Sequence, residues 1–160
     1  MREIPLTQGY VAIVDDADYD RLASRSWQAL RLSPDHVYAV HMRRTGGKGG
    51  GRVVRVYMHR ELMGAESQRL IDHANGNTLD NRRENLRFAT PSQNAQNSRK
   101  RPGCTSMFKG VSWHKRSRRW RAKIKANGQE QHLGSFLTED AAREAYQQAA
   151  ARLHGAFARL

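Results

Sequence analysis

The clearest hydrophobic pattern of the chain lies in its C-terminal third. From Arg119 to Ala126 apolar and basic residues alternate, so that Trp120 and Ile124 share one face of a predicted strand and basic side chains share the other. Shorter runs at Gly110–Lys115 and Gln131–Phe136 flank this strand, with a turn at residues 117–118 and the hairpin signal Asn-Gly at 127–128. The pattern predicts a three-stranded antiparallel sheet with one apolar face and one cationic face.

An alanine stripe at helical spacing follows this sheet and predicts the helix that covers it. Thr138 is a good N-cap, and Gly155 is a typical stop. Glu139 and Asp140 favour the first turn because the N-terminal end of a helix is electropositive. Between Thr138 and Gly155, alanines recur on one side of the predicted helix, and their small side chains let a helix lie close to a sheet.

The first half of the chain has shorter patterns, which predict a mixed α+β unit. Strands are expected near Tyr10–Val14, Trp27–Leu30, Val37–Val40 and Val53–Met58, with a turn and short helix ending at Ala23. The glycine-rich stretch Thr45–Gly51 is expected to be a hairpin loop. Trp27 and Tyr38 are interpreted as packing residues rather than as ligands.

Residues 71–97 are rich in polar side chains of the kind found in catalytic sites. A strand is expected to end at Ile71, with a tight turn at Ala74–Gly76. Asp80 is expected to cap a helical turn, and Thr90 with Pro91 and Gln93 has the pattern of a capping box. A strand, a turn, a second strand or loop and a helix then follow one another.

This order can bring a carboxylate, an imidazole and an amide into one crevice. Oxygen ligands without a thiolate favour Mg²⁺ or Mn²⁺, and a neighbouring imidazole can take a proton from water that attacks a phosphodiester. The alternative is that Asp72, Asn81, Asn85 and Asn94 only cap turns and helices, and residue types alone favour that interpretation.

The charge of the chain indicates a polyanionic partner. Its 160 residues contain 28 Lys and Arg against 15 Asp and Glu, a net charge of +13. Residues 96–160 hold 14 of the basic residues and only 4 acidic ones. A nucleic-acid backbone fits this excess better than a membrane surface, which would call for an amphipathic helix, whereas a merely solvated basic surface is the remaining alternative.

Cysteine usage and hydropathy exclude several other classes. The single Cys104 excludes a disulfide framework and a cysteine-based zinc module. No segment is apolar enough for a membrane span, and the N-terminus lacks the pattern of a secretory signal. A cytoplasmic location is therefore expected.

Residues 57–97 resemble the HNH endonuclease family, in particular its homing-type enzymes of phages and mobile introns. The elements that carry the resemblance are Met58-His59-Arg60, Asp72-His73, Asn75-Gly76-Asn77, Asp80-Asn81, Asn85-Leu86-Arg87 and Thr90-Pro91-Ser92-Gln93-Asn94. The resemblance implies the ββα-metal nuclease fold and a metal-dependent endonuclease that nicks or cuts double-stranded DNA.

The resemblance also implies roles for single residues. His73 matches the general base that activates water, and Asp72 matches the metal-binding carboxylate beside it. Asn85 matches the central residue that braces the loop, whereas Asn94 stands where many relatives have a final His and would be the second ligand of Mg²⁺. For His59 and Arg60, contact with the scissile phosphate and structural hydrogen bonding remain equal alternatives. On the first alternative, His59 is a candidate catalytic residue and Arg60 is a candidate DNA contact.

The last part of the chain resembles the plant APETALA-two/ethylene-response-factor DNA-binding domain. The resemblance rests on Gly110-Val111-Ser112-Trp113, Trp120-Arg121-Ala122 and His132-Leu133-Gly134-Ser135-Phe136, together with alanines and a tyrosine of the helix. That family places its sheet in the DNA major groove. The positions matching its contact residues are Lys109, Ser112, His114, Arg121, Lys123, Lys125, Glu130 and His132.

The chain is accordingly expected to have an α+β fold in which a ββα-metal HNH unit precedes a three-stranded antiparallel sheet packed on one helix. The nuclease unit would span residues 1–98 with its core at 57–98, followed by a basic linker at 99–106 and the DNA-binding domain at 107–160. No obligate protein partner is evident. A DNA-binding regulator with an inactive HNH unit is the alternative function, and an RNA-binding protein, with Trp113 as a stacking platform, is a weaker one.

Overall fold

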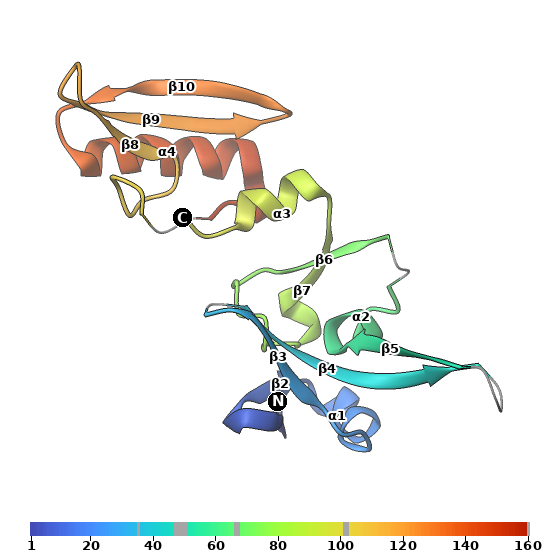
Figure 1. Ribbon diagram of the computed structural model, residues 1–160. Coiled ribbons are helices and arrows are strands. Elements are labelled where there is room, and N and C mark those ends of the chain that lie inside the picture. The colour runs from blue at the N-terminus through green and yellow to red at the C-terminus, as the bar shows by residue number, and fades with distance from the viewer. Residues whose placement is uncertain (35, 47–50, 66–67, 101–102, 160) are drawn as a thin grey trace. The chain divides into compact units, whose positions relative to one another are not determined.

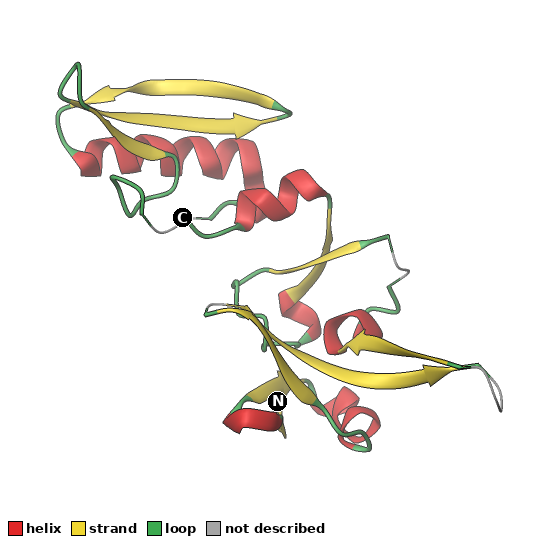
Figure 2. Cartoon of the chain, viewed as in Figure 1, coloured by secondary structure: helices red, strands yellow, loops and turns green. Residues whose placement is uncertain are grey.

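The computed structural model describes residues 1–160 except 35, 47–50, 66–67, 101–102 and 160. It has a mixed α/β fold with several small antiparallel sheets and few helices (Figures 1 and 2). The chain forms two compact units, Met1–Ala89 and Thr90–Leu160, and each is described by itself. Within the described ranges no helix is long and apolar enough to cross a membrane.

The described residues of the first unit form three small antiparallel sheets and short helices. A three-stranded sheet has the strand order β3-β4-β5, and two-stranded sheets pair β1 with β2 and β6 with β7, all antiparallel. The bounds of these elements are β1 Arg2–Pro5, β2 Val11–Val14, α1 Asp16–Ala23, β3 Gln28–Ser33, β4 His36–Thr45, β5 Arg52–Tyr57, α2 Met58–Leu62, β6 Leu70–His73 and β7 Leu86–Ala89, with single 3-10 turns η1 at Thr7–Gly9 and η2 at Arg83–Asn85.

One apolar core holds the first unit together. Leu22 of α1 and Met58 of α2 are fully buried, and Trp27 lies between α1 and β3 with its indole Nε1 donating to the carbonyl of Leu22 at 2.8 Å. The core also includes Leu86, the first residue of β7. The strand hairpin β6–β7 is therefore attached to the core at its closed end, where the turn between the two strands begins.

The turn chemistry of residues 74–85 differs in part from expectation. The tight turn after β6 is present, because the amide of Gly76 donates to the carbonyl of His73 at 2.8 Å and Gly76 has a φ of +73°. Such a φ suits glycine, which has no Cβ. The cap expected from Asp80 is wrong: Arg82 is the N-cap residue of the 3-10 turn η2, and the amide of Arg83 donates to Oδ2 of Asp15 at 2.8 Å, whereas Asp80 binds the side chain of Arg82.

The second unit begins with a capped helix and continues into the sheet. Its elements are α3 Pro91–Asn97, β8 Val111–His114, β9 Arg119–Ala126, β10 Gln129–Phe136, α4 Glu139–His154 and the 3-10 turn η3 Gly155–Phe157. The capping box of Thr90 and Gln93 is confirmed, with both reciprocal hydrogen bonds present. The antiparallel order β10-β9-β8 and the N-cap from Thr138 are confirmed as well.

Helix α4 covers one face of this sheet (Figure 1). Ala142, Ala149 and Ala150 of the helix pack with Val111, Ala122 and Ile124 of the strands. Gly110, just before β8, has a φ of +72°, and a Cβ at this position would collide with the ring of Tyr146 and the carbonyl of Lys123. The small residues thus allow the close approach of helix and sheet.

Candidate active site and nucleic-acid interface

Asp72 and His73 are the last residues of β6, and both are buried. In the antiparallel pairing with β7, Asp72 lies opposite Arg87 and His73 lies opposite Leu86. The guanidinium of Arg87 donates to Oδ2 of Asp72 from Nε at 2.8 Å and from Nη2 at 2.7 Å. The carboxylate is therefore held in place by a charge-assisted pair of hydrogen bonds across the strands.

Asn81 lies within hydrogen-bond distance of the imidazole of His73. The side chain of Asn81 is only 1% exposed; its Nδ2 donates to the carbonyl of Leu79 at 3.1 Å, and its Oδ1 lies 3.5 Å from Nε2 of His73. An amide oxygen only accepts, so this contact is a hydrogen bond in the tautomer of His73 that carries its proton on Nε2.

A cluster of aromatic rings surrounds His73. The rings of His59, from α2, and His73 have centroids 5.1 Å apart and meet edge to face. Tyr38 of β4 contacts both imidazoles, at 5.6 Å from His59 and 6.3 Å from His73, and Tyr57 lies 5.5 Å from His59. The structure thus brings His59 together with His73, and adds two tyrosines to the site.

Burial keeps both histidines neutral. It lowers the pKa of His59 to about 3, with a further lowering from the nearby charges of His73 and Arg60. Burial also lowers the pKa of His73, although the hydrogen bond with Asn81 and the carboxylates of Asp72 and Asp80 oppose the shift. A neutral imidazole is the form that can accept a proton.

Asn85 ties the loop between β6 and β7 together. Its Oδ1 accepts the amide of Asn75 at 2.9 Å, and its Nδ2 donates to the carbonyl of Asp80 at 2.7 Å. The Asp80 carboxylate in turn accepts from Asn75 at 2.8 Å and from Arg82 at 2.8 Å, which lowers its pKa. The loop that follows His73 is therefore fixed by buried hydrogen bonds at several points.

The N-terminal strands support the same loop from outside. The amide of Ile13 in β2 donates to Leu79 at 2.9 Å and its carbonyl accepts from Asn81 at 2.8 Å, forming a short parallel bridge. The hydroxyl of Thr78 donates to the carbonyl of Val37 in β4 at 2.6 Å. Strands β2 and β4 therefore have a structural role, which is to hold the loop that contains Asn81 next to His73.

Asn94 belongs to the second unit, and Arg60 forms structural hydrogen bonds within the first. Asn94 is exposed on α3, which belongs to the second unit, whereas Asp72 and His73 belong to the first. Arg60 of α2 donates to the carbonyls of Arg69 at 2.9 Å and Ala65 at 3.5 Å. Of the two alternatives for Arg60, the structure therefore contains the structural hydrogen bonds.

The outer face of the sheet β8–β10 carries most of the expected DNA contacts. Cross-strand partners share a face, so Ser112 lies beside Arg121, Lys123 beside His132, and Lys125 beside Glu130. His114 lies on the same face, opposite Arg119, and its Nδ1 is 2.7 Å from the hydroxyl of Ser117. Nζ of Lys123 forms an exposed ion pair with Glu130 at 2.7 Å. The structure thus brings together all of the expected contacts except Lys109 and Arg60.

Arg121 and Trp113 differ in what they offer to a nucleic acid. Nε of Arg121 is buried and has no hydrogen-bond partner in the described part of the chain. Trp113 lies on the opposite face of the sheet, where its ring packs edge to face against Trp120 with centroids 5.1 Å apart. Packed in this way, Trp113 is not an open platform for a stacked base, which argues against the RNA-binding alternative.

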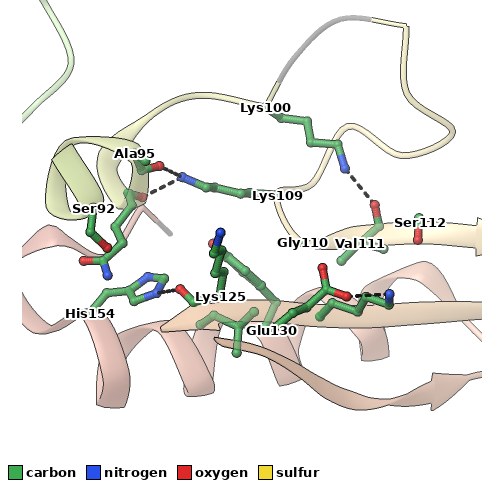
Figure 3. Close-up of a pocket in the computed structure, with 14 residues that line it drawn as sticks. Ser92, Ala95, Lys100, Lys109, Gly110, Val111, Ser112, Lys125, Glu130 and His154 are labelled. Atoms are coloured by element: carbon green, nitrogen blue, oxygen red, sulfur yellow. Dashed lines mark hydrogen bonds and ion pairs between the residues drawn. The ribbon is translucent and has the colours of Figure 1, made fainter. Parts of the chain in front are cut away.

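Lys109 lies beside a cavity of about 360 Å³ between α3, the sheet and α4 (Figure 3). Its Nζ donates to the carbonyls of Ala95 at 2.8 Å, Gln96 at 2.6 Å and Ser98 at 2.7 Å, at the C-terminal end of α3. Burial lowers the pKa of Lys109 to about 8, with a contribution from the charge of Arg159. The ammonium thus caps a helix end here, and a DNA contact by Lys109 would require that these hydrogen bonds break.

Sequence reasoning missed several residues that contact Asp72, His73 or His59. They are Tyr38, Tyr57, Asn81 as the partner of Nε2, and Arg87 as the partner of Asp72. Asn81 and Arg87 belong to the motif elements of the HNH resemblance, so the motif itself contained a signal for them. Nothing in the sequence points to the two tyrosines, which reach the site only through the folding of β4 and β5.

Comparison with known proteins finds sequence matches that include this stretch of the chain. A sequence model of the HNH endonuclease family matches residues 65–96, which include Asp72, His73 and the whole loop braced by Asn85. The chain is 36% identical over 89 residues to Protein 3.8 of Escherichia phage T7, a stretch that covers 56% of this chain and 73% of the phage protein. No solved structure matches the chain.

The chain therefore belongs to the same family as Protein 3.8 of phage T7, and its residues 65–96 match the HNH endonuclease model. It is also 38% identical over 66 residues to the AP2-like ethylene-responsive transcription factor TOE2 of Arabidopsis thaliana. That similarity covers 41% of this chain but only 14% of the plant protein. It is a similarity to one part of a much longer protein.

Proposed function

We propose that the protein is a metal-dependent endonuclease that hydrolyses phosphodiester bonds of double-stranded DNA. The observation that carries this proposal is the buried, neutral imidazole of His73, oriented by Asn81 and located beside the carboxylate of Asp72 within the HNH-matching residues. A buried histidine that served packing alone would need neither a fixed tautomer nor an adjacent buried carboxylate.

In the proposed reaction, Nδ1 of His73 takes a proton from a water molecule as the water oxygen bonds to the phosphorus. The bond between phosphorus and the 3′ oxygen then breaks. Nε2 keeps its proton because it faces Oδ1 of Asn81. Asn85 holds the loop that carries Asn81, so it acts on His73 through the loop rather than on the substrate.

Asp72 and Asn94 would hold the metal ion. In the described ranges no group of three or more His, Cys, Asp and Glu side chains forms a metal site. One carboxylate and one amide oxygen, with water and phosphate oxygens completing the shell, form a donor set that suits Mg²⁺ or Mn²⁺. The chemistry supplied by such an ion is stabilisation of negative charge on the scissile phosphate and the leaving 3′ oxygen.

The second unit would bind DNA through the outer face of β8–β10. Lys123 and Lys125 are placed to contact phosphates, whereas Arg121 is placed beside Ser112 for contact with base edges. A separate binding sheet raises the local concentration of the nuclease at its site. Such a combination suits a homing-type enzyme of phages or mobile elements.

Incubation with supercoiled plasmid DNA, with Mg²⁺ or with a chelator, tests the proposed activity. We expect conversion to nicked or linear DNA only with the metal ion, and its loss in His73→Ala and Asp72→Asn. Asn77→Ala is the matched control, because Asn77 lies in the same loop but is exposed. If the wild-type protein binds DNA without metal-dependent cleavage of DNA that contains its site, the protein is a DNA-binding regulator instead.

A further inference from the structure

The hairpin formed by β4 and β5 has two faces whose residues are defined by the strand register. Val40 lies opposite Tyr57, Met42 opposite Arg55, and Arg44 opposite Val53, so these residues share one face. Arg43 lies opposite Val54, and Thr45 lies opposite Arg52, on the other face. Each face of the hairpin therefore carries two arginines (Figure 1 shows the hairpin).

One of these faces leads directly to the candidate active site. Tyr38 and Tyr57 belong to the face of Arg44 and Arg55, and their rings contact each other at 5.7 Å. The same two rings contact the imidazole of His59, and Tyr38 also contacts His73. Arg55 lies two residues before Tyr57 in β5, and two residues span about 7 Å along a strand. The opposite face leads instead to His41, which is buried beside Trp27.

The arginines of this hairpin do not stabilise the described part of the first unit through ion pairs. Arg43, Arg44, Arg52 and Arg55 are all exposed, and their guanidinium groups form no ion pair with any residue in the described ranges. Their neighbours Met42 and Val53 are exposed too, at 50% and 58%. Unpaired arginines along an extended, open surface are suited to a row of phosphates.

We propose that Arg44 and Arg55 bind backbone phosphates of the DNA strand that enters the candidate active site, along the face that begins at Tyr38 and Tyr57. This proposal rests on the proposed function, because it takes His73 as the point of cleavage. It assigns to the β4–β5 hairpin a contact with DNA that is separate from the sheet β8–β10.

A pair of matched double variants of the full chain tests the proposal. Arg44→Ala/Arg55→Ala and Arg43→Ala/Arg52→Ala remove the same charge from the same hairpin but from opposite faces. Binding to a 30-base-pair duplex is measured in chelator at several salt concentrations, so the result does not depend on cleavage. We expect the slope of log affinity against log salt to fall by about 2 in the first variant, and to stay near the wild-type value in the second.

Two outcomes would overturn the proposal. Equal losses in both variants would mean that only general charge matters, and an unchanged slope in the first variant would mean that this face does not touch DNA. Arg44→Lys/Arg55→Lys keeps the charge and should restore most of the slope. A wild-type protein that binds but does not cleave would contradict the proposed function, while these binding slopes would still decide whether the arginines contact DNA.

Discussion

The loop around His73 and the sheet β8–β10 use polar residues in opposite ways. In the first unit, Asp72, His73, Asn81 and Asn85 are all buried and joined to one another or to neighbours by hydrogen bonds. In the second unit, the core is built from alanines and other apolar residues, and Lys123 and Lys125 lie exposed on a regular sheet. Polar groups are internal in one region and external in the other.

This difference matches the two tasks that the protein is proposed to perform. A proton transfer needs a neutral imidazole that is held in place, and burial with a hydrogen bond to Asn81 supplies both for His73. Contact with phosphates needs charges that can adapt to a partner, and exposed lysines supply them. A change that damages one region should therefore leave the other intact, which the following variants test in order of expected effect.

Gly110→Ala should have the largest effect on stability, and should affect the second unit. A Cβ there meets the Tyr146 ring and the Lys123 carbonyl, and the φ of +72° adds strain, so we expect a loss of about 3 kcal/mol or more. Hydrogen exchange read by mass spectrometry should show lost protection after Thr90 and little change before it. Equal loss in residues 1–89 would show that the units do not unfold separately.

Asn85→Ala should destabilise the first unit by about 2–4 kcal/mol. The substitution leaves the amide of Asn75 and the carbonyl of Asp80 without their partner in a buried loop. Urea unfolding measures the loss, and cleavage should fall with it, while affinity for DNA stays close to wild type. Asn77→Ala is the control, because this exposed side chain caps only the Leu79 amide. A loss in the control as large as in Asn85→Ala would contradict the bracing role.

His59 should make the first unit sensitive to mild acid. Its pKa lies near 6.5 in the unfolded chain and at about 3 in the folded one, so between these values the unfolded state binds more protons. The free energy of unfolding should therefore fall as the pH drops below 6.5, by about 1.4 kcal/mol per pH unit from this group. His59→Gln should flatten the pH dependence measured by urea unfolding from pH 7 to 5, and an unchanged slope would refute the assignment.

Lys125→Ala should have the smallest effect, a reduction of the salt dependence of DNA binding by about 0.9 in slope. Lys125 is exposed on the outer face of β9. Arg152→Ala removes the same charge from an exposed position in the last turn of α4 and is the control. Equal slopes for the two variants would show that the face of the sheet has no special contact with DNA.

Regular patterns made the second unit predictable. The alternation from Arg119 to Ala126 gave the strand β9 with its observed bounds, and the capping signals at Thr90 and Thr138 placed the starts of α3 and α4. Local rules decide such features, because each depends on residues within one turn or one strand. The unexpected position of Lys109, by contrast, depends on how the chain returns to the end of α3.

The site around His73 was predictable only in part. Asp72 and His73 could be identified from a motif, but the contacts that orient them involve residues far apart in sequence. Tyr38 approaches His73 across 35 positions of chain, and Val37 holds Thr78 across 41. No local pattern encodes such approaches. The Asp80 cap failed for a similar reason, because the first amide of η2, that of Arg83, is bound by Asp15 from 68 positions away.

A paired measurement of binding and cleavage tests the division of roles most directly. Dissociation constants are measured in chelator, and single-turnover cleavage with Mg²⁺ at saturating protein, for His73→Ala and for the triple variant Arg121→Ala/Lys123→Ala/Lys125→Ala. We predict that His73→Ala loses cleavage by at least about 100-fold with unchanged affinity. The triple variant should lose affinity by about 10-fold or more and keep its cleavage rate at saturation. Parallel losses of both quantities in both variants would contradict the account.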